Sequence, residues 1–357
     1  MNRRTTVIIA AASSLAVAGA VTQSLVGHAS PAAPATTSAS AATSASAQAA
    51  ATVSAAAAVK PLPKTMTFYV DPKSGPATWV AQNRTDSRAA AIRSGVSSKP
   101  MARWFGTWSG TIKPAVNSYV TAAAKKRKTP VLVAYNIPGR DACGGQSAGG
   151  TTAGSEYRTW IKGFAGGIGQ RRAVVVLEPD ALADFQCLSS AQASTRQKLL
   201  TYATAQLHKS APKAYVYLDA GNSNYASASA MSGRLIKSGL KNVRGFSLNV
   251  SNFHTTAQEN AFAVKLNAQL RKRGAKTKPY VIDTSRNGAG SNGTWCNPGG
   301  RRLGVTSRVN QTPKANQPEA RLWIKTPGES DGNCGTAAGV AAGVFDPQLA
   351  VNLVRGN

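Results

Sequence analysis

Acidic residues follow strand-like segments at five places in the chain, each beside glycine or proline. The five segments lead to Asp141, Glu178-Pro-Asp180, Asp219, Asp283 and Glu329-Ser-Asp331. The protein has only 14 acidic residues against 42 lysines and arginines, so this placement calls for an explanation. Active sites of parallel α/β folds lie where strands end and loops begin. Several carboxylates that converge there would form an acid/base site.

Cleavage of an acetal is one reaction that such carboxylates could catalyse. It needs an acid that protonates the leaving oxygen and a second group that activates water or stabilises positive charge. Asp180 is the best candidate for the acid, because it follows an apolar run and a proline and precedes Ala181-Leu-Ala183. Apolar surroundings raise the pKa of a carboxyl group, and a nearby carboxylate such as Asp141 would raise it further. The alternative is that Glu178 and Asp180 only cap the following helix.

The other acids also have structural alternatives. Asp219 precedes Ala-Gly and Asp331 lies in a loop rich in turn residues, so either could simply be a turn residue. Asp283 has Arg286 three residues further on, and we expect the two to form a structural ion pair.

Strand-like and helix-like segments alternate along the chain. We expect strands at 67–70, 103–106, 131–135, 173–178, 215–219, 244–249, 280–283 and 321–325, and helices at 77–91, 112–126, 155–166, 191–210, 226–238 and 256–273. This alternation predicts an α/β fold with a parallel sheet. About eight units with acids at the strand ends predict a distorted, TIM-like β/α barrel with its groove at the strand C-termini. A doubly wound open sheet is the competing fold, but nucleotide-binding glycine motifs are missing.

The N-terminal part of the sequence predicts export. Residues 1–29 combine Arg3 and Arg4 with an apolar stretch and small residues near a cleavage site, as in a secretory signal peptide. A transmembrane anchor is the alternative. Residues 30–60 are almost entirely Ala, Ser, Thr and Pro and predict a disordered linker. Residues 61–357 then form one catalytic domain, and we expect a secreted, extracellular monomer without membrane contact after signal cleavage.

The numbers of cysteines and histidines limit the kinds of cross-link and active site that the chain can form. The four cysteines are Cys143, Cys187, Cys296 and Cys334, and in an exported protein they predict two disulfides with three possible pairings. The chain has three histidines, and one of them, His28, falls in the signal. This argues against a histidine-based metal site and against a Ser-His-Asp triad. We therefore expect no metal and no cofactor.

The formal net charge of +28 favours anionic partners such as nucleic acid or an acidic polysaccharide. The basic residues are nevertheless scattered, and the dense runs at 125–128 and 271–273 fall at the ends of expected helices, where cations are favourable. We interpret the charge as a solvated surface and expect no nucleic-acid partner. A dedicated polyanion-binding role is the alternative.

Seven motifs occur in an order that matches a known family. They are Tyr135-Asn-Ile-Pro-Gly-Arg-Asp141, Glu178-Pro-Asp180, Tyr217-Leu-Asp219-Ala-Gly, Asn249-Val-Ser-Asn, Asp283-Thr-Ser-Arg-Asn-Gly, Trp295-Cys-Asn-Pro and Trp323-Ile-Lys-Thr-Pro-Gly-Glu-Ser-Asp331-Gly. From about Phe68 to the C-terminus the chain resembles the cellulases of glycoside hydrolase family six. The resemblance implies a distorted β/α barrel that cleaves β-1,4-glucan with inversion at the anomeric carbon.

The resemblance also implies roles for individual residues. Asp180 takes the position of the general acid, and Asp141 that of the group that raises the pKa of the acid and is linked to the catalytic water. Asp331 takes the position of the proposed base, whose direct action is disputed in the family. Asp219 matches a further aspartate near the acid, and Tyr135 matches a tyrosine that crowds the sugar ring and favours its distortion.

Substrate contacts follow from the same resemblance. The residues that match substrate-binding motifs are Trp104, Ser147, Asn249, Trp295, Lys325 and Glu329. Trp104 and Trp295 match sugar-stacking positions, and Ser147 matches a serine on a mobile loop that holds water.

The family pattern implies the disulfide pairs Cys143–Cys187 and Cys296–Cys334, but four positions depart from it. Asp-Cys becomes Asp141-Ala-Cys143, and Asp-Gly-Cys becomes Asp331-Gly-Asn-Cys334, so each bridge is displaced by one residue from its aspartate. Asn222 replaces the usual histidine, and Tyr225 stands where a stacking tryptophan often follows.

Chain length between two motifs bears on how the substrate enters. Only 25 residues (296 to 320) separate Trp295 from Arg321, which is short for a tunnel roof. The main hypothesis is therefore an endo-β-1,4-glucanase with an open cleft and a β-1,4-glucan partner. The alternatives are a hydrolase of the same fold that acts on another or charged polysaccharide, and a non-catalytic protein that binds cell walls or polyanions.

Overall fold

The computed structural model describes residues 60–314 and 316–357. The predicted signal peptide and the linker up to residue 59, with the alternative membrane anchor, lie outside the described residues. The helices are α1 (Gly75–Gln82), α2 (Ala89–Ile92), α3 (Ile112–Lys125), α4 (Gly154–Ile168), α5 (Ser190–Ser210), α6 (Ala228–Lys237), α7 (Thr256–Lys272) and α8 (Pro347–Arg355).

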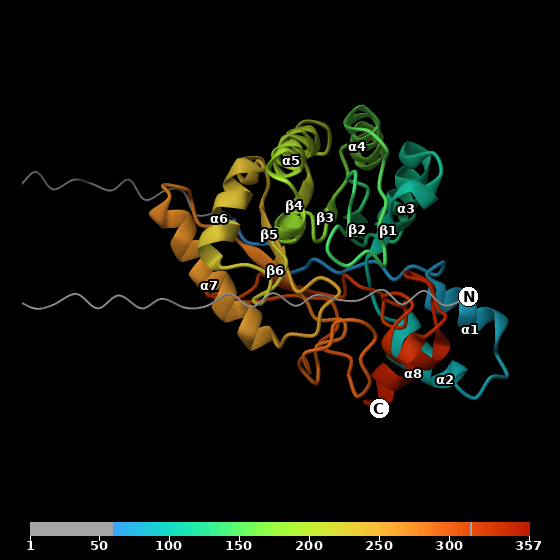
Figure 1. Cartoon of the computed structure of the whole chain (residues 1–357). Coiled ribbons are helices and arrows are strands. Elements are labelled where there is room, and N and C mark those ends of the chain that lie inside the picture. The colour runs from blue at the N-terminus through green and yellow to red at the C-terminus, as the bar shows by residue number, and fades with distance from the viewer. Residues whose placement is uncertain (1–59, 315) are drawn as a thin grey trace, which may run out of the picture. The chain divides into compact units, whose positions relative to one another are not determined.

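One eight-stranded sheet forms the centre of the domain (Figure 1). Its strands are β1 (Arg103–Phe105), β2 (Val131–Ala134), β3 (Ala173–Leu177), β4 (Ala214–Asp219), β5 (Gly245–Leu248), β6 (Tyr280–Asp283), β7 (Arg308–Val309) and β8 (Ala320–Leu322). Their order in the sheet is β1-β2-β3-β4-β5-β6-β8-β7. All neighbours pair in parallel except β7, which runs antiparallel to β8. The parallel strands therefore present their carboxyl ends at one edge.

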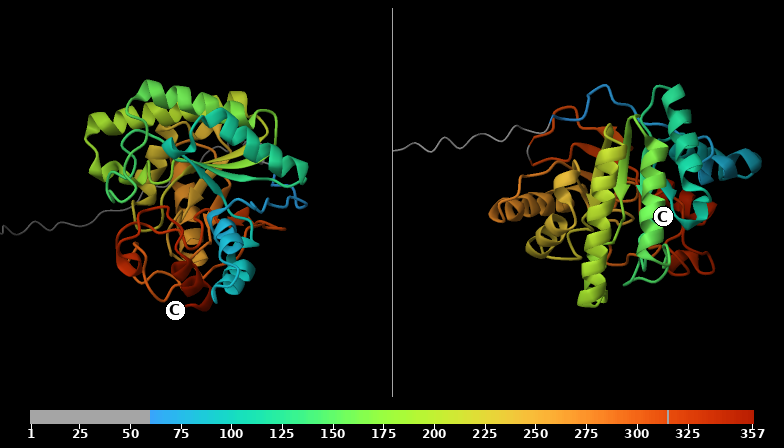
Figure 2. Two further views of the ribbon diagram at one scale, coloured as in Figure 1. Left: turned by 90° about the vertical axis from the view of Figure 1, so that its right-hand side faces the viewer. Right: turned by 90° about the horizontal axis from the view of Figure 1, so that it is seen from above.

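Both faces of the sheet are apolar, and each packs against a different layer. In β2, Leu132 and Ala134 pack toward the helices, whereas Val131 and Val133 join a second core cluster on the opposite face. This alternation follows from the two-residue period of a strand. Helices α3 to α7 follow one another along the outer face of β1 to β6, as Figures 1 and 2 show. A sheet covered on both faces explains the continuous hydrophobic runs that predicted its strands.

The barrel is distorted and does not close by a strand ladder. β1 and β7 are the two edges of the sheet, yet the N–H of Ala102 donates to the carbonyl of Trp323 (2.8 Å), so the chain before β1 meets the chain after β8. Helices α1, α2 and α8 pack together through a separate apolar cluster that includes Trp323. These features confirm the predicted distorted β/α barrel over the doubly wound open sheet.

The predicted elements differ from the structure in several places, and helix α8 (Pro347–Arg355) was not predicted at all. Residues 67–70 form no strand, and only Phe68 makes a single bridge to Thr129. The helix expected at 77–91 is broken after α1, because Asn83 donates its side-chain amide to the carbonyl of Trp79 and Asp86 accepts the N–H of Arg88. Such local side-chain bonds compete with a continuous helix. The two-residue strand β7 is too short to show a period and was not predicted.

No helix within residues 60–314 and 316–357 is long and apolar enough to span a membrane.

Close packing of α3 on α4 depends on a glycine that faces the partner helix. A Cβ added at Gly167 would lie 2.7 Å from Val116 Cβ and 2.8 Å from the carbonyl oxygen of Lys113. A Cβ at the preceding Gly166 would approach nothing closer than Lys113 Cε at 3.7 Å, an ordinary van der Waals contact. The two neighbouring glycines therefore differ in the space available for a side chain.

We expect Gly167→Ala to lower the free energy of unfolding by about 1–3 kcal/mol, because the added methyl group overpacks the contact between α3 and α4. Gly166→Ala is the matched control, and it should raise the free energy of unfolding by about 0.5–1 kcal/mol through helix propensity. Urea unfolding of both variants measures the two effects. Equal stabilities would contradict the proposed packing of Gly167.

Candidate active site

The acids predicted from the strand ends gather at the carboxyl edge of the sheet. Asp180 follows β3, Asp219 ends β4, and the loops after β2 and β8 carry Asp141 and Asp331. A cavity of about 760 Å³ opens here, and its acidic lining residues are Asp71, Asp141, Asp180, Asp184, Glu329 and Asp331. Asp219 and Asp283 lie behind this lining and are fully buried.

Asp180 is the carboxyl group of the cavity whose environment most favours its proton. Burial raises the pKa of Asp180 well above its usual range, and the negative charges of Asp219, Asp184 and Asp141 act in the same direction. Lys325 opposes the shift only weakly. Two like charges close together in a poorly solvated site cannot both ionise easily. Asp180 therefore lines the cavity in surroundings that favour its protonated form.

Asp219 is held by three hydrogen bonds beneath the acid. Its carboxylate accepts the N–H of Gly221 (2.9 Å), the hydroxyl of Ser247 (2.9 Å) and the N–H of Asp180 (3.1 Å). Burial raises the pKa of Asp219 to about 7, and these donors limit the rise. The bond to Gly221 is the turn interaction that the sequence allowed, but the bond to Asp180 also fixes the backbone of the acid.

Glu178 joins the ends of two adjacent strands. Its buried carboxylate accepts the N–H groups of Asn136 (2.9 Å) and Ile137 (3.0 Å), which follow β2. Burial raises the pKa of Glu178 to about 7. The alternative that Glu178 caps the following helix is therefore wrong, because its side chain binds the segment that follows the neighbouring strand β2.

A hydrogen-bonded chain connects Asp141 to the tyrosine of the same motif. The backbone N–H of Ser147 donates to Asp141 Oδ2 (2.6 Å), and so does the Ser147 hydroxyl (3.0 Å). The hydroxyls of Tyr135 and Ser147 are also in hydrogen-bond contact (3.0 Å). Burial raises the pKa of Tyr135, with the charge of Asp180 adding to the effect. The ring of Tyr135 meets Trp104 edge-on at 5.1 Å, which places this group next to a predicted sugar platform.

Asp184 belongs to the site but was missed in the sequence. Its carboxylate lines the cavity, accepts the N–H of Ala142 (2.8 Å) and lies 3.8 Å from Arg196. Burial raises the pKa of Asp184. It lies four residues after Asp180 within an apolar run, and that spacing was the available signal. Asp184 thus links the segment after β3 to the loop that carries Asp141.

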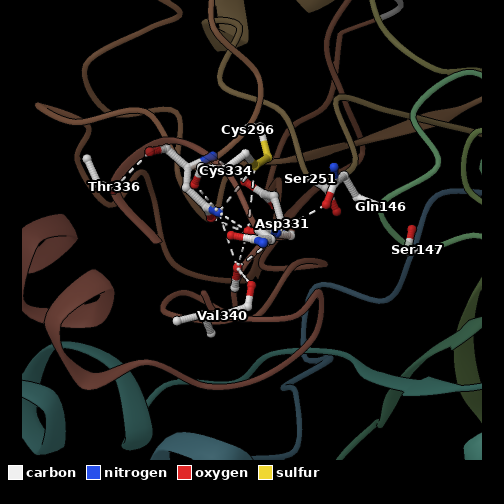
Figure 3. The surroundings of a disulfide bond; sticks show 12 residues. Gln146, Ser147, Ser251, Cys296, Asp331, Cys334, Thr336 and Val340 are labelled. Carbon is white, nitrogen blue, oxygen red and sulfur yellow. Dashed lines mark hydrogen bonds between the residues drawn. A yellow bond between two sulfur atoms is a disulfide. The ribbon is translucent and has the colours of Figure 1, made fainter. Parts of the chain in front are cut away.

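Asp331 is an ion-paired carboxylate, in contrast to Asp180. It lies 2.8 Å from Arg286 Nη1 and 3.6 Å from Lys325 Nζ, and it accepts the N–H of Asn297 (3.1 Å). Figure 3 shows Asp331 beside the bridge between Cys296 and Cys334. Burial acts to raise the pKa of Asp331, but the two cations outweigh it and the pKa is lowered. The surroundings of Asp331 therefore favour its ionised form, whereas those of Asp180 favour the protonated form.

The predicted ion pair between Asp283 and Arg286 is wrong. Arg286 turns to Asp331 and to the carbonyl of Ser251, and its guanidinium packs over Phe253 at 4.3 Å. Asp283 is instead satisfied by backbone N–H groups, among them those of Ser285 (2.8 Å) and Lys325 (2.9 Å). A carboxylate with several backbone donors needs no cation, which frees Arg286 for the site.

Both implied disulfides are present, Cys143–Cys187 and Cys296–Cys334. The residue that displaces each bridge from its aspartate makes a contact of its own. Ala142 binds Asp184, as described above, and the N–H of Asn333 donates to the side-chain oxygen of Gln146 (3.1 Å). The second contact joins the loop of Asp141 to the loop of Asp331 across the site.

Five of the six predicted substrate-binding residues line the cavity. These are Trp104, Ser147, Trp295, Lys325 and Glu329. The sixth prediction needs correction, because Asn249 has no exposed surface and lies outside the lining. Its amide donates to the carbonyls of His254 (3.0 Å) and Asp283 (2.9 Å), so it holds the backbone of the site together. Tyr225 lines the cavity, whereas Asn222 is buried behind it.

The backbone around the site is held in an uncommon conformation. Non-glycine residues with positive φ include Asp141, Glu178, Asp180, Ser251 and Asn297, with φ between 40° and 65°. Such conformations are costly and persist where the surroundings impose them, often at functional sites. No group of three or more His, Cys, Asp or Glu among the described residues is placed to hold a metal ion.

Comparison with known proteins agrees with this geometry. The profile of glycosyl hydrolases family 6 matches residues 63–355. The chain belongs to this family. It is 51% identical to Endoglucanase 1 of Streptomyces halstedii over 82% of this chain and 91% of that protein. It is 40% identical to Endoglucanase A of Thermobispora bispora, over 80% of this chain but only 61% of that protein's length.

Solved structures of the family also match this fold. The endoglucanase Cel6 from Mycobacterium tuberculosis, in complex with methyl-cellobiosyl-4-deoxy-4-thio-β-D-cellobioside, aligns with a TM-score of 0.75 and 40% sequence identity. The match covers 82% of this chain and 97% of that one. The endoglucanase CEL6B from Humicola insolens aligns with a TM-score of 0.67 and 25% identity.

Buried carboxyl groups in and around the site make folding stability depend on pH. Glu259 at the start of α7 is an example outside the cavity, since its carboxylate accepts the hydroxyl (2.8 Å) and the N–H (3.1 Å) of Ser223. Burial raises the pKa of Glu259 to about 7. An unfolded glutamate releases its proton near pH 4.3. The folded state therefore binds the extra proton between these values, and stability falls as pH rises through them.

We expect Glu259→Gln to reduce this loss of stability between pH 4.5 and 7.5 by about 2–4 kcal/mol, because the amide has no proton to release. Urea unfolding of the wild type and the variant at several pH values measures the difference. Glu156 is the control, because its pKa is lowered by hydrogen bonds to Thr152. Glu156→Gln should leave the decline in place, and equal slopes in the wild type and Glu259→Gln would contradict the assignment.

Proposed function

We propose that the protein is an inverting endo-β-1,4-glucanase that cleaves internal bonds of cellulose or a related β-glucan. The observation that carries the proposal is that one cavity holds Asp180, whose burial and acidic neighbours favour its proton, and Asp331, which is paired with Arg286 and Lys325. An inverting glycosidase needs one carboxyl group as acid and a second, ionised group that acts through water. Membership of the family and the names of its relatives support the same substrate class.

In this proposal Asp180 protonates the oxygen of the leaving sugar. Asp141 and Ser147 hold the water that attacks the anomeric carbon, since their hydrogen bond faces the same cavity. Asp331 is the ionised carboxylate that accepts the proton released by this water, through intervening water molecules. Its negative charge also lies opposite the positive charge that develops on the sugar ring. Asp219 positions the backbone of the acid, and Tyr135 crowds the ring and favours its distortion.

The sugar chain is proposed to lie along the cavity between aromatic and charged side chains. Trp104 and Trp295 offer flat faces to pyranose C–H groups, while Lys325 donates hydrogen bonds to sugar hydroxyls and Glu329 accepts them. A second candidate function is hydrolysis of another or charged polysaccharide. Tyr225 in the cavity lining and the net charge of +28 favour it, and activity screening across neutral and anionic β-glucans distinguishes the two.

We further propose that residues 1–29 are a signal peptide, residues 30–60 a linker, and residues 61–357 a secreted monomeric catalytic domain. The two disulfides support an oxidising compartment, because such bonds are rare in the cytosol. N-terminal sequencing of the exported protein and its mass in solution test these assignments.

We expect Asp180→Ala to lower kcat on soluble cellulose by at least 10²- to 10⁴-fold, because general acid catalysis contributes about that much. Binding of cellohexaose, measured by calorimetry, should be retained. Asp86→Asn is the control, because this carboxyl pairs with Arg88 outside the cavity lining. Retained turnover in Asp180→Ala would reject Asp180 as the acid, and NMR of the first product should show the α-anomer if the reaction inverts.

We expect Asp184→Asn to move the alkaline limb of the pH–activity profile to lower pH. The charge of Asp184 raises the pKa of Asp180, so its removal lets the acid lose its proton at a lower pH. An asparagine oxygen can still accept the N–H of Ala142, which keeps the loop in place. The profile of kcat against pH measures the shift, and an unmoved alkaline limb would show that Asp184 does not act on the acid.

A further inference from the structure

Trp108 is an exposed aromatic side chain on the wall of the cavity, and neither the sequence motifs nor the proposed mechanism uses it. It is 55% exposed, more than any other large hydrophobic residue described. Single exposed hydrophobic residues are common and need no explanation by themselves. Trp108 differs because it lines the same cavity as Asp180, as does Trp295, which is 45% exposed.

The ring of Trp108 is held in place by its own turn. It lies in a 3₁₀ turn, Thr107–Ser109, directly after β1. A Cβ at Gly106 would come within 2.3–2.8 Å of three atoms of the indole ring, so the ring packs against the bare backbone of this glycine. The Ser109 hydroxyl accepts the N–H of Gly106 (3.1 Å) and closes the turn. A tryptophan fixed in this way loses little conformational freedom when a ligand binds.

Arg140 connects Trp108 to the centre of the site. Its guanidinium carbon lies 5.2 Å from the ring centroid of Trp108 and 4.8 Å from that of Tyr135. The arginine is itself buried, and its Nε donates to the carbonyl of Ser147 (2.9 Å). The guanidinium of Arg140 therefore lies between the two aromatic rings and makes a cation–π contact with each. Tyr135 in turn meets Trp104, so Trp108 belongs to a continuous aromatic wall that starts beside the acid.

We propose that Trp108 is an additional sugar-binding platform for a β-1,4-glucan chain that extends beyond the residues around the scissile bond. The indole of Trp108 is 55% exposed on the cavity wall, and this large apolar area with fixed geometry suits the C–H groups of a pyranose ring. The occupant is a glucan chain rather than a protein because the platform is continuous with the site in which the chain is cleaved. This inference rests on the proposed function and names one further contact of the same substrate.

Oligosaccharides of increasing length test the platform. A contact remote from the scissile bond stabilises the ground state and the transition state alike, so it acts mainly on KM. We expect Trp108→Ala to lower kcat/KM for cellohexaose by about tenfold through KM. The loss should be much smaller for cellotriose, which is too short to occupy every position of the cavity. Trp108→Phe should recover part of the loss, because a smaller aromatic face remains.

Two controls distinguish a specific effect of Trp108 from a general loss of activity or folding. Val264→Ala removes another exposed hydrophobic side chain, which lies on α7 outside the cavity lining, and it should behave as the wild type at every length. Thermal unfolding of each variant verifies that the fold is intact. An equal loss at all lengths, or no loss on cellohexaose, would overturn the platform while the proposed function stands. A wild-type protein without activity on any β-1,4-glucan would overturn both.

Discussion

A carboxyl group that must keep its proton at the working pH is the constraint on which the rest of this structure depends. Asp180 meets it because burial and three neighbouring acids disfavour its ionisation. Two of these neighbours, Asp219 and Asp184, are themselves buried, and each accepts a hydrogen bond from another strand or loop. The hydroxyl of Ser247 on β5 donates to Asp219, and the N–H of Ala142 donates to Asp184. Hydrogen bonds to these buried acids therefore help to position the strand ends, together with the packing of the apolar core.

This arrangement explains why an irregular barrel supports the site. Parallel strands bring their carboxyl ends to one edge, where the buried acids meet. Side-chain bonds such as those of Glu178 and Asn249 then connect one strand end to the next. The two disulfides attach the outer loops to this framework. Rigidity at the strand ends lets the backbone of Asp180 and Asp141 remain at positive φ, which isolated loops would not sustain.

Periodic segments and ordered motifs made the barrel predictable from the sequence, and most of the predicted site residues line the cavity. Side-chain contacts between residues that are brought together only by the fold could not be predicted. Arg286 is three residues from Asp283, yet backbone donors satisfy Asp283 and Arg286 turns to Asp331. Asn249 lies in a family motif, but it holds buried carbonyls instead of lining the cavity. Asp184 and Trp108 lie outside the recognised motifs, and only the structure shows that both line the cavity.

The contact between Gln146 and Asn333 has a consequence for how a polymer reaches the acid. It is one hydrogen bond between loops that are each tied down separately by a disulfide. A single bond of this kind contributes about 1 kcal/mol, little more than thermal energy. If this contact opens, a cellulose chain enters the site from the side, at any point along its length and without presenting a free end.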